Sequence, residues 1–419
     1  MYRIALRAVT AFLLLAGLSA CAPFGPHRTD VGAAEECRLP ADVSVATPEC
    51  RQASIERTDR YDIAYIELSD QGWLHFRDQV ERAFRLLNQP DAAQREVQVV
   101  LFVHGWQHSA EFEDFDVTRF REVVLPAFAG QHPERRTVGI YIGWRGQSIT
   151  WQGLNTLSFY DRKFTAEHVA RGSIREVISR LRVLQDSDGR APGQPRVHVT
   201  LAGHSFGGLI VFNAIAESLM DSLVRAGATG PLRPSVDLVV LLNPAFEASR
   251  FEPLFQIARR NIGGSGGDAP PIFVSITSAA DNATRLAFPL GRTINSLFDH
   301  ESWTDEDACP GGRQADGDCA DGDRSMRLEK LTNTHTVGHL DRYLTHWLEP
   351  ASASDAATTL TPRCVRAENG PMSAPGSAFP LWTMRAQPLV IADHHDIYRP
   401  GLWVFLARLA AGGARELCP

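Results

Sequence analysis

The chain has 419 residues, a formal net charge of −7, and hydrophobic residues at 44% of its positions. This apolar content is sufficient for a large core and excludes a chain that is disordered throughout. No basic block stands out, so we expect no nucleic-acid partner.

The N-terminus has the pattern of an export signal. Arg3 and Arg7 form a short positive region, and the apolar run 9–20 that follows is too short to span a bilayer comfortably. The run ends in Leu-Ser-Ala-Cys at Cys21, which resembles a bacterial lipobox. The resemblance implies that residues 1–20 are a lipoprotein signal peptide and that Cys21 is lipidated. A plain secretory signal is the alternative.

A lipid on Cys21 would attach the mature protein to a membrane surface without threading it through. In such lipoproteins an aspartate after the cysteine marks retention in the inner membrane. Ala22 stands there instead, so we expect a periplasm-facing protein of the outer membrane. Residues 21–55 contain Pro, Gly, Ala and charge without a clear period, which predicts a tether between membrane and domain.

Six further cysteines agree with export, because an even number in an exported chain permits disulfides. Six cysteines allow 15 pairings. Proximity in the sequence favours Cys37–Cys50 and Cys309–Cys319, which leaves Cys364 to pair with Cys418.

Strand and helix patterns then alternate along the chain. Apolar runs predict strands, and apolar residues at helical spacing predict the helices between them. The expected elements are a strand 61–68, a helix 76–87, a strand 97–103, a helix 115–128, a strand 138–144, a helix 174–184, a strand 197–202 with a helix after it, strands 236–242, 272–278 and 388–392, and a helix from about 402. The pattern degrades over about 283–383, which predicts an insertion before the last strand.

The sequence Gly203-His204-Ser205-Phe206-Gly207 lies between a predicted strand and a predicted helix. It matches the G-x-S-x-G nucleophile elbow, in which a serine stands exposed on a strained turn. The two glycines suit this turn because side chains at those positions would collide with their neighbours. A buried turn serine in an ordinary strand–helix unit is the alternative interpretation.

Alternating strands and helices predict an α/β fold with a mostly parallel central sheet and helices on both faces. Such sheets place their chemistry at the carboxyl ends of the strands. His104, Ser205, Asp281 and His394 all follow predicted strands directly.

With these residues in place, the chain resembles an α/β-hydrolase from roughly residue 60 to its end. More narrowly, it resembles an uncharacterised group of bacterial lipid-anchored, esterase-like hydrolases. Three further segments support this resemblance: Gly143-Trp144-Arg145-Gly146, Ser158-Phe159-Tyr160-Asp161-Arg162-Lys163, and His394-His395-Asp396-Ile397. The resemblance implies one hydrolase domain over 56–419, with a serine, an acid and a histidine in chain order.

We predict Ser205 as the nucleophile, since a serine hydroxyl needs a base within hydrogen-bond reach. His394 is the favoured base and His395 the alternative. The acid should close the strand before the histidine strand, and Asp281 lies there. Asp299 and Asp305 are the fallback acids.

The segment His104-Gly105-Trp106 follows the strand that feeds the oxyanion hole in this fold. The expected donors are the main-chain N–H groups of Trp106 and Phe206. We expect His104 itself to be structural. An aromatic-walled pocket for an apolar ester group is a further hypothesis, resting on Trp106, Trp144, Trp151 and Phe159.

The resulting prediction is a membrane-anchored serine hydrolase that cleaves a small-molecule or lipid carboxylic ester through an acyl-enzyme, without a cofactor or metal. An acyltransferase with the same triad and a catalytically inactive envelope binding protein are the alternatives. A metal-dependent hydrolase using His335, His339 and His346 is less favoured, because no H-E-x-x-H glutamate accompanies them.

Overall fold

The computed structural model describes most of the chain. The described residues are 25–29, 36–89, 96–146, 159–186, 196–229, 232, 236–262, 270–289, 331–351, 365–372 and 379–412. The lipobox with Cys21, the cysteines at 309, 319, 364 and 418, Trp151, and the fallback acids Asp299 and Asp305 lie outside these residues.

The described strands form one sheet in the order β1-β2-β3-β5-β4-β6-β7-β8-β11-β9-β10. All pairings from β3 to β9 are parallel, whereas β2 pairs with β3 and β10 with β9 in antiparallel fashion. The strands are β1 (Glu36–Arg38), β2 (Ile55–Arg57), β3 (Tyr61–Leu68), β4 (Glu96–Val103), β5 (Arg136–Trp144), β6 (Arg196–His204), β7 (Leu238–Leu242), β8 (Phe273–Ser278), β9 (His346–Pro350), β10 (Val365–Asn369) and β11 (Leu381–Ala386).

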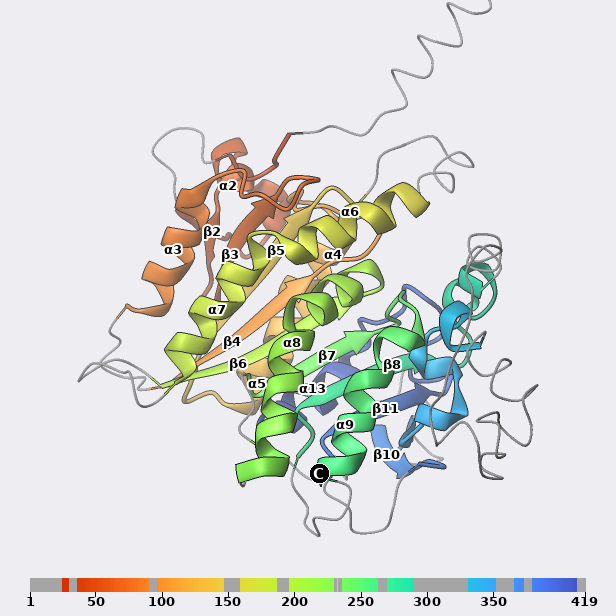
Figure 1. The fold of residues 1–419 in the computed structure, drawn as a ribbon. Helices are drawn as coiled ribbons and strands as arrows, with labels where there is room; N and C mark the ends of the chain where they lie inside the picture. The colour runs from red at the N-terminus through yellow and green to blue at the C-terminus, as the bar shows by residue number, and fades with distance from the viewer. Residues whose placement is uncertain are drawn as a thin grey trace, which may run out of the picture.

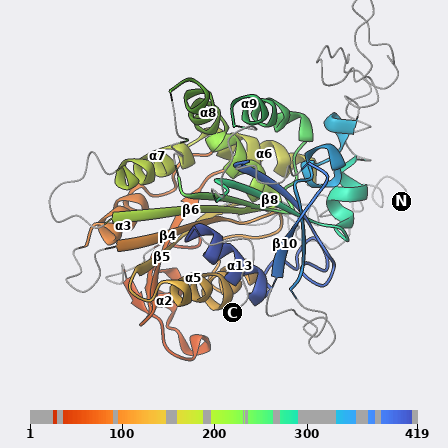
Figure 2. The same cartoon turned by 90° about the horizontal axis from the view of Figure 1, so that it is seen from below.

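Helices cover both faces of this sheet (Figures 1 and 2). One apolar core holds α3 (Arg77–Leu87), α7 (Ile174–Gln185), α8 (Phe206–Thr229) and α9 (Glu252–Ile262) against one face. A second core holds α5 (Leu125–Gln131) and α13 (Pro400–Ala410) against the other. The central strands are continuously apolar because both of their faces are covered. The remaining described helices are α2 (Pro48–Gln52), α4 (Phe115–Arg119), α6 (Phe159–Arg171) and the short turns η1 (Val43–Val45), η2 (Phe120–Val124), η4 (Ala248–Arg250), η5 (Ala283–Ala287), η7 (Val337–His339) and η8 (Asp341–Tyr343).

Among the described residues, one helix, α8, is apolar enough over Phe206–Gly227 to cross a membrane by length and composition. Its apolar residues Leu209, Phe212 and Ile215 belong to the core between α8 and the sheet. We therefore interpret α8 as a core helix.

The fold class is the predicted one, and two parts of the chain differ from expectation. The last parallel strand is β11 at Leu381–Ala386, whereas the predicted strand 388–392 contains a turn. The alternation of Trp382 and Met384 with polar neighbours hid this strand among Pro- and Ser-rich flanks. The predicted insertion also contributes to the sheet, because β9 and β10 extend it beyond β11.

The segment expected to be a tether is largely built into the domain. Residues 36–57 form β1, η1, α2 and β2, and a disulfide joins Cys37 to Cys50, as proximity in the sequence predicts. Strand β2 pairs with β3, which makes the segment an edge of the sheet. The domain boundary therefore lies well before residue 56.

A buried ion-pair cluster holds this edge. Glu56 is fully buried and accepts hydrogen bonds from Arg28 (2.8 Å), from Arg121 (2.5 and 2.7 Å) and from the hydroxyl of Tyr65 (2.9 Å). Burial alone would raise the pKa of Glu56, but the two guanidinium groups outweigh it and hold the pKa below its ordinary value. The guanidinium of Arg28 also lies 3.6 Å from the centre of the Tyr65 ring.

We predict that Glu56→Gln lowers the free energy of unfolding by about 3–5 kcal/mol, because it leaves two buried guanidinium groups without their counter-charge. Urea unfolding of the purified protein measures this loss. Arg38→Ala is the matched control: its ion pair with Asp59 is exposed and should contribute less than about 1 kcal/mol. Equal losses in the two variants would contradict the prediction.

Candidate active site

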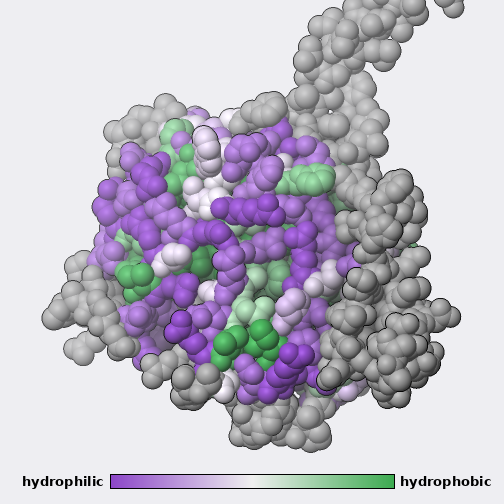
Figure 3. All heavy atoms as spheres, viewed as in Figure 1, coloured by the Kyte–Doolittle hydropathy of each residue, from purple (hydrophilic) through white to green (hydrophobic). Residues whose placement is uncertain are grey.

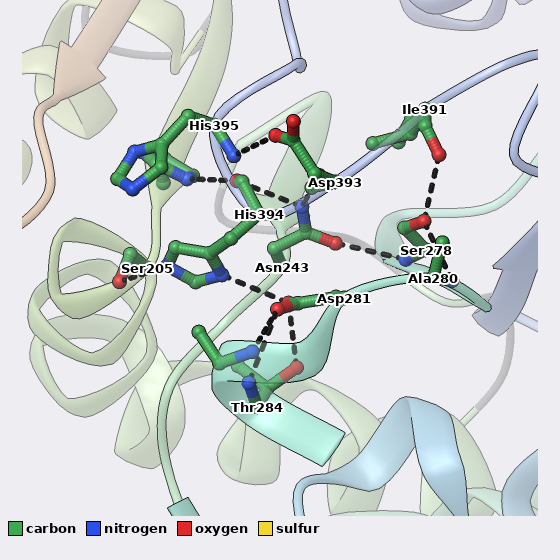
Figure 4. Close-up of polar contacts among 12 residues, drawn as sticks. Ser205, Asn243, Ser278, Ala280, Asp281, Thr284, Ile391, Asp393, His394 and His395 are labelled. Carbon is green, nitrogen blue, oxygen red and sulfur yellow. Dashed lines mark hydrogen bonds and ion pairs between the residues drawn. The ribbon is translucent and has the colours of Figure 1, made fainter. Parts of the chain in front are cut away.

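Loops from four neighbouring strands meet at the carboxyl edge of the sheet (Figure 4). Ser205 follows β6, Asn243 follows β7, Asp281 follows β8, and His394 lies beyond β11. Because the strands are parallel neighbours, residues distant in the sequence come together here.

Ser205 occupies the turn between β6 and α8 with a φ of 54°. This left-handed conformation costs energy for a residue with a side chain, and it persists where the surroundings fix it. Here the Ser205 N–H donates to the carbonyl of Leu242, and the Ser205 carbonyl accepts from the N–H of Ala245. The main chain of the loop after β7 thus fixes the strained turn.

Two glycines make this turn possible. A Cβ on Gly207 would lie 2.0 Å from the carbonyl oxygen of Val103, and one on Gly203 would lie 2.5 Å from the carbonyl oxygen of Gly207. Neither position has room for a side chain, so the spacing of the G-x-S-x-G sequence follows from the close approach of α8 to the ends of β4 and β6.

The imidazole of His394 lies between Ser205 and Asp281 (Figure 4). Its Nε2 is 2.9 Å from the Ser205 Oγ, and its Nδ1 is 2.8 Å from the Asp281 Oδ2. Nδ1 donates to the carboxylate, which leaves Nε2 free to accept the proton of the serine hydroxyl. The structure thus brings the three residues proposed from sequence into one hydrogen-bonded chain.

Asp281 is buried, yet its pKa lies below the ordinary value of an aspartate. Burial alone would raise its pKa, but hydrogen bonds from His394 and Thr284 outweigh this effect and hold the pKa below its ordinary value. Its Oδ1 accepts the N–H groups of Ala283 and Thr284, and its Oδ2 accepts the Thr284 hydroxyl at 2.6 Å. The carboxylate is therefore both ionised and fixed in direction.

Thr284 connects this carboxylate to a residue of the predicted insertion. Its hydroxyl lies 2.9 Å from the Nε2 of His339. Because the only hydroxyl hydrogen of Thr284 points to Asp281, His339 donates and Thr284 accepts. Burial lowers the pKa of His339 to about 4, so its ring is neutral near pH 7. Sequence reasoning missed this contact, since nothing local relates residues 284 and 339.

The loop that bears His394 is fixed through its own main chain. The His394 carbonyl accepts from His204 Nε2 (2.8 Å) and from the Asn243 side-chain amide (2.9 Å). Asn243 also accepts the N–H of Ser278 at 2.8 Å and has a φ of 44°. His204 and Asn243 were not predicted to have roles, although His204 lies inside the elbow sequence and Asn243 directly follows a predicted strand.

His395, the alternative base, lies beside the site. Its ring centre is 5.1 Å from that of His394 and 6.5 Å from that of His108. Among the described residues, the His395 ring forms no hydrogen bond with Ser205 or Asp281. The geometry therefore favours His394 over His395 as the base.

The loop after β4 lies against Ser205. A Cβ on Gly105 would be 3.0 Å from the Ser205 Cβ. His104 is buried, its ring is stacked on Trp144 at 5.6 Å, and it accepts the Trp144 N–H at 3.1 Å. The other ring nitrogen lies 2.9 Å from the Gly105 carbonyl and donates to it. His104 is thus a structural residue.

This contact also sets the direction of the Trp106 N–H. In a trans peptide the carbonyl and the N–H point to opposite sides. Because the Gly105 carbonyl faces the His104 ring, the N–H of Trp106 points away from it. The N–H of Phe206 is among the first of α8, where main-chain donors have no acceptor within the helix. These two N–H groups stay the predicted oxyanion donors.

Helix α6 covers this edge of the sheet and contains part of the predicted Ser158–Lys163 motif. Arg162 is buried and donates to Asp70 and to the Arg145 carbonyl, both at 3.0 Å. Lys163 forms a buried ion pair with Glu247. The motif therefore fixes α6 to the loops that follow β3, β5 and β7.

The three histidines of the metal hypothesis have separate partners in the structure. His339 contacts Thr284, the Nδ1 of His335 lies near the Leu331 carbonyl, and the His346 ring packs at a tilt against Trp382. They do not converge on one point, so the arrangement gives this hypothesis no support.

A different cluster has ligand atoms within 4.8 Å of one another: His108, Asp114 and Asp116. The Nδ1 of His108 is 3.1 Å from Asp114, and its Nε2 is 3.5 Å from Asp116. Burial alone would lower the pKa of His108, but the two carboxylates outweigh it and raise the pKa. We interpret the cluster as a hydrogen-bonded group that fixes the loop after Trp106.

A model of the alpha/beta hydrolase family matches residues 100–411, whereas no curated protein matches the chain. Esterase B from Lactobacillus rhamnosis is 16% identical, with a TM-score of 0.21, over 49% of this chain and 64% of that one. Aspergillus fumigatus lipase B is 14% identical, with a TM-score of 0.22, over 62% of this chain and 48% of that one. The chain thus spans less than two thirds of either protein.

The family match covers most of the chain and includes the serine turn, the acid loop and the histidine loop. The protein belongs to the α/β-hydrolase family.

Proposed function

We propose that this protein is a serine hydrolase that cleaves carboxylic esters through an acyl-enzyme intermediate. The observation that supports this most is the hydrogen-bonded chain Asp281–His394–Ser205 at a strained turn. Backbone strain of this kind costs free energy, and it clusters at active sites.

In the first step, the Ser205 Oγ attacks the ester carbonyl carbon while its proton passes to His394 Nε2. The Asp281 carboxylate stabilises the resulting imidazolium through Nδ1–H. The N–H groups of Trp106 and Phe206 stabilise the oxyanion, and one such donor lowers the barrier by about 3 kcal/mol.

In the second step, the tetrahedral intermediate collapses and the alcohol leaves with the proton from His394. Water then attacks the acyl-enzyme with His394 as the base, which releases the carboxylic acid and restores Ser205. If an alcohol replaced water here, the same residues would perform acyl transfer.

Aromatic side chains beside the serine favour an apolar substrate group. The rings of Trp106 and Phe159 meet edge to face at 5.7 Å, and Phe159 lies 4.8 Å from Phe206. Trp144, also considered from sequence, packs on His104 and is buried. The aromatic wall thus consists of the partly buried Trp106 and Phe159 side chains, and the fully buried Phe206 ring supports Phe159 from the core.

We further propose that the enzyme is attached to the bacterial envelope through a lipid on Cys21. The support for this is the sequence of residues 1–21, with its positive start, its short apolar run and its lipobox-like end. The periplasmic side of the outer membrane remains our expected location.

Ser205→Ala should reduce hydrolysis of a p-nitrophenyl ester on the order of a million-fold, because it removes the attacking oxygen. The melting temperature should change little, since the turn is fixed by main-chain hydrogen bonds. A fluorophosphonate probe should label Ser205 in the wild-type protein and nothing in the variant. Undiminished turnover would exclude a serine mechanism, and an absence of labelling in the wild type would favour a binding protein. Product analysis with an added alcohol distinguishes hydrolysis from transfer.

His394→Ala and His395→Ala form a matched pair at neighbouring positions. We expect His394→Ala to lose turnover by at least about ten-thousand-fold, as for removal of a general base acting with a nucleophile. His395→Ala should retain turnover within about tenfold, because its ring forms no hydrogen bond with Ser205 or Asp281 in the described part of the chain. Steady-state kinetics with a soluble ester tests this, and the reverse ranking would make His395 the base.

Thr284→Val should lower the unfolding free energy by about 1.5–3 kcal/mol at pH 7, since it removes a hydrogen bond to a charged group. The hydrogen bond is one of those that hold the pKa of Asp281 down, so its stabilisation is full above the ordinary pKa of aspartate and is lost as the pH falls through the lowered pKa.

The difference in unfolding free energy between the wild type and Thr284→Val should therefore become smaller below about pH 4. Urea unfolding across that range measures it, and Thr284→Ser, which keeps the hydroxyl, is the control. A gap that stays constant with pH would show that Thr284 acts only by packing.

A further inference from the structure

We infer that the catalytic edge of the sheet faces the lipid bilayer and that the natural substrates are esters held in that bilayer. This rests on the proposed serine hydrolase and on its attachment through Cys21. The first described residues of the chain support it, because they are fixed at the same edge of the sheet as Ser205.

Residues His27 and Arg28 are held at the carboxyl end of β3. Their N–H groups donate to the two oxygens of the Glu67 carboxylate, at 2.8 and 2.7 Å. The Arg28 side chain is fully buried, and its Nε donates to the Ala110 carbonyl in the loop after β4. The start of the described chain is therefore held at a fixed point on this edge.

This point lies beside the proposed oxyanion loop. Gly25, Pro26 and His27 line a cavity of about 260 Å³ together with Gln107 and other residues that follow β3, β4 and β5. Gln107 directly follows Trp106, and Gly105 lies against Ser205. The exit of the N-terminal segment and the nucleophile thus belong to neighbouring loops.

Three residues separate Cys21 from Gly25 in the sequence. Even a fully extended chain across these four steps spans only about 14 Å. A lipid on Cys21 would therefore keep the point of exit, and the catalytic edge with it, close to the membrane surface. A long flexible tether would impose no such orientation.

Several exposed apolar side chains lie in segments at the catalytic edge of the sheet. Trp73 is 72% exposed in the turn after β3, and Phe164 is 64% exposed on α6. Phe115, Leu286 and Leu389 are also exposed and follow β4, β8 and β11. Each is an apolar group at the carboxyl end of the sheet, where membrane contact would bury it.

The buried contacts of Arg162 and Lys163 fix α6, so Phe164 stands on a rigid support. On the face covered by α7 and α8, by contrast, the surface is mainly hydrophilic, with small and separate apolar patches (Figure 3). Val183 and Val224 are exposed there, but they lie toward the ends of α7 and α8 remote from the catalytic edge. They offer matched control positions.

Photocrosslinking measures the orientation independently of activity. The full chain, expressed in a bacterial host that attaches lipid, is placed on vesicles of phosphatidylethanolamine and phosphatidylglycerol containing a diazirine-bearing phospholipid. We expect crosslinks in the turn 69–75 and on α6, and none at the ends of α7 and α8 near Val183 and Val224. Crosslinks spread evenly, or concentrated at the control positions, would overturn the inference. A protein that does not associate with the vesicles would overturn it together with the anchor.

Activity provides the second measurement. Phe164→Glu should lower hydrolysis of a medium-chain ester embedded in the vesicles by about tenfold, whereas Val183→Glu should stay within about twofold. Both variants should retain wild-type turnover of soluble p-nitrophenyl butyrate. Equal effects of the two variants on the vesicle ester would contradict the inference. A wild-type protein that cleaves neither ester would refute the proposed hydrolase, and the crosslinks would still report the orientation.

Discussion

The hydrogen bond between Asp281 and His394 is the interaction on which the site depends. It joins two residues 113 positions apart and orients the His394 ring so that its Nε2 faces the Ser205 hydroxyl. A bond of 2.8 Å between loops requires both strand ends to be held firmly. The pairing of the parallel strands β8 and β11 holds these strand ends in place. Asn243 and His204 fix the histidine loop by donating to the His394 carbonyl. The sheet thus determines the distance between the Asp281 and His394 loops, and the side-chain hydrogen bonds determine how the carboxylate and the imidazole are oriented.

Much of the fold could be predicted from the sequence because its signals are local. The apolar run at 97–103 and the β-branched residues Val197, Val199 and Thr200 indicated strands, and the two glycines around Ser205 indicated a tight turn. Asp281 was found by its position after a strand, whereas His394 was placed after a predicted strand 388–392 that contains a turn, since the strand before it is β11 at Leu381–Ala386. Their meeting in the structure is a consequence of strand order, which the family resemblance implied.

Other contacts left no local trace in the sequence. The hydrogen bond from His339 to Thr284 depends on the path of an insertion, and the pairing of β2 with β3 depends on one buried glutamate. Residues 27–57 have the composition of a linker, yet Arg28 and Glu56 neutralise each other inside the domain. Composition reports the average polarity of a segment, whereas a single buried ion pair can determine whether that segment packs into the domain.

The docking of Arg28 has a consequence for how the domain can fold. Arg28 precedes Glu56 by 28 positions, and Arg121 follows Glu56 by 65 positions. Closure of the β3 edge therefore waits until distant parts of the chain arrive, and a gene fragment beginning at residue 56 would lack the cation that completes the cluster. The folded domain therefore includes residue 28, well before the strands that its side chain stabilises.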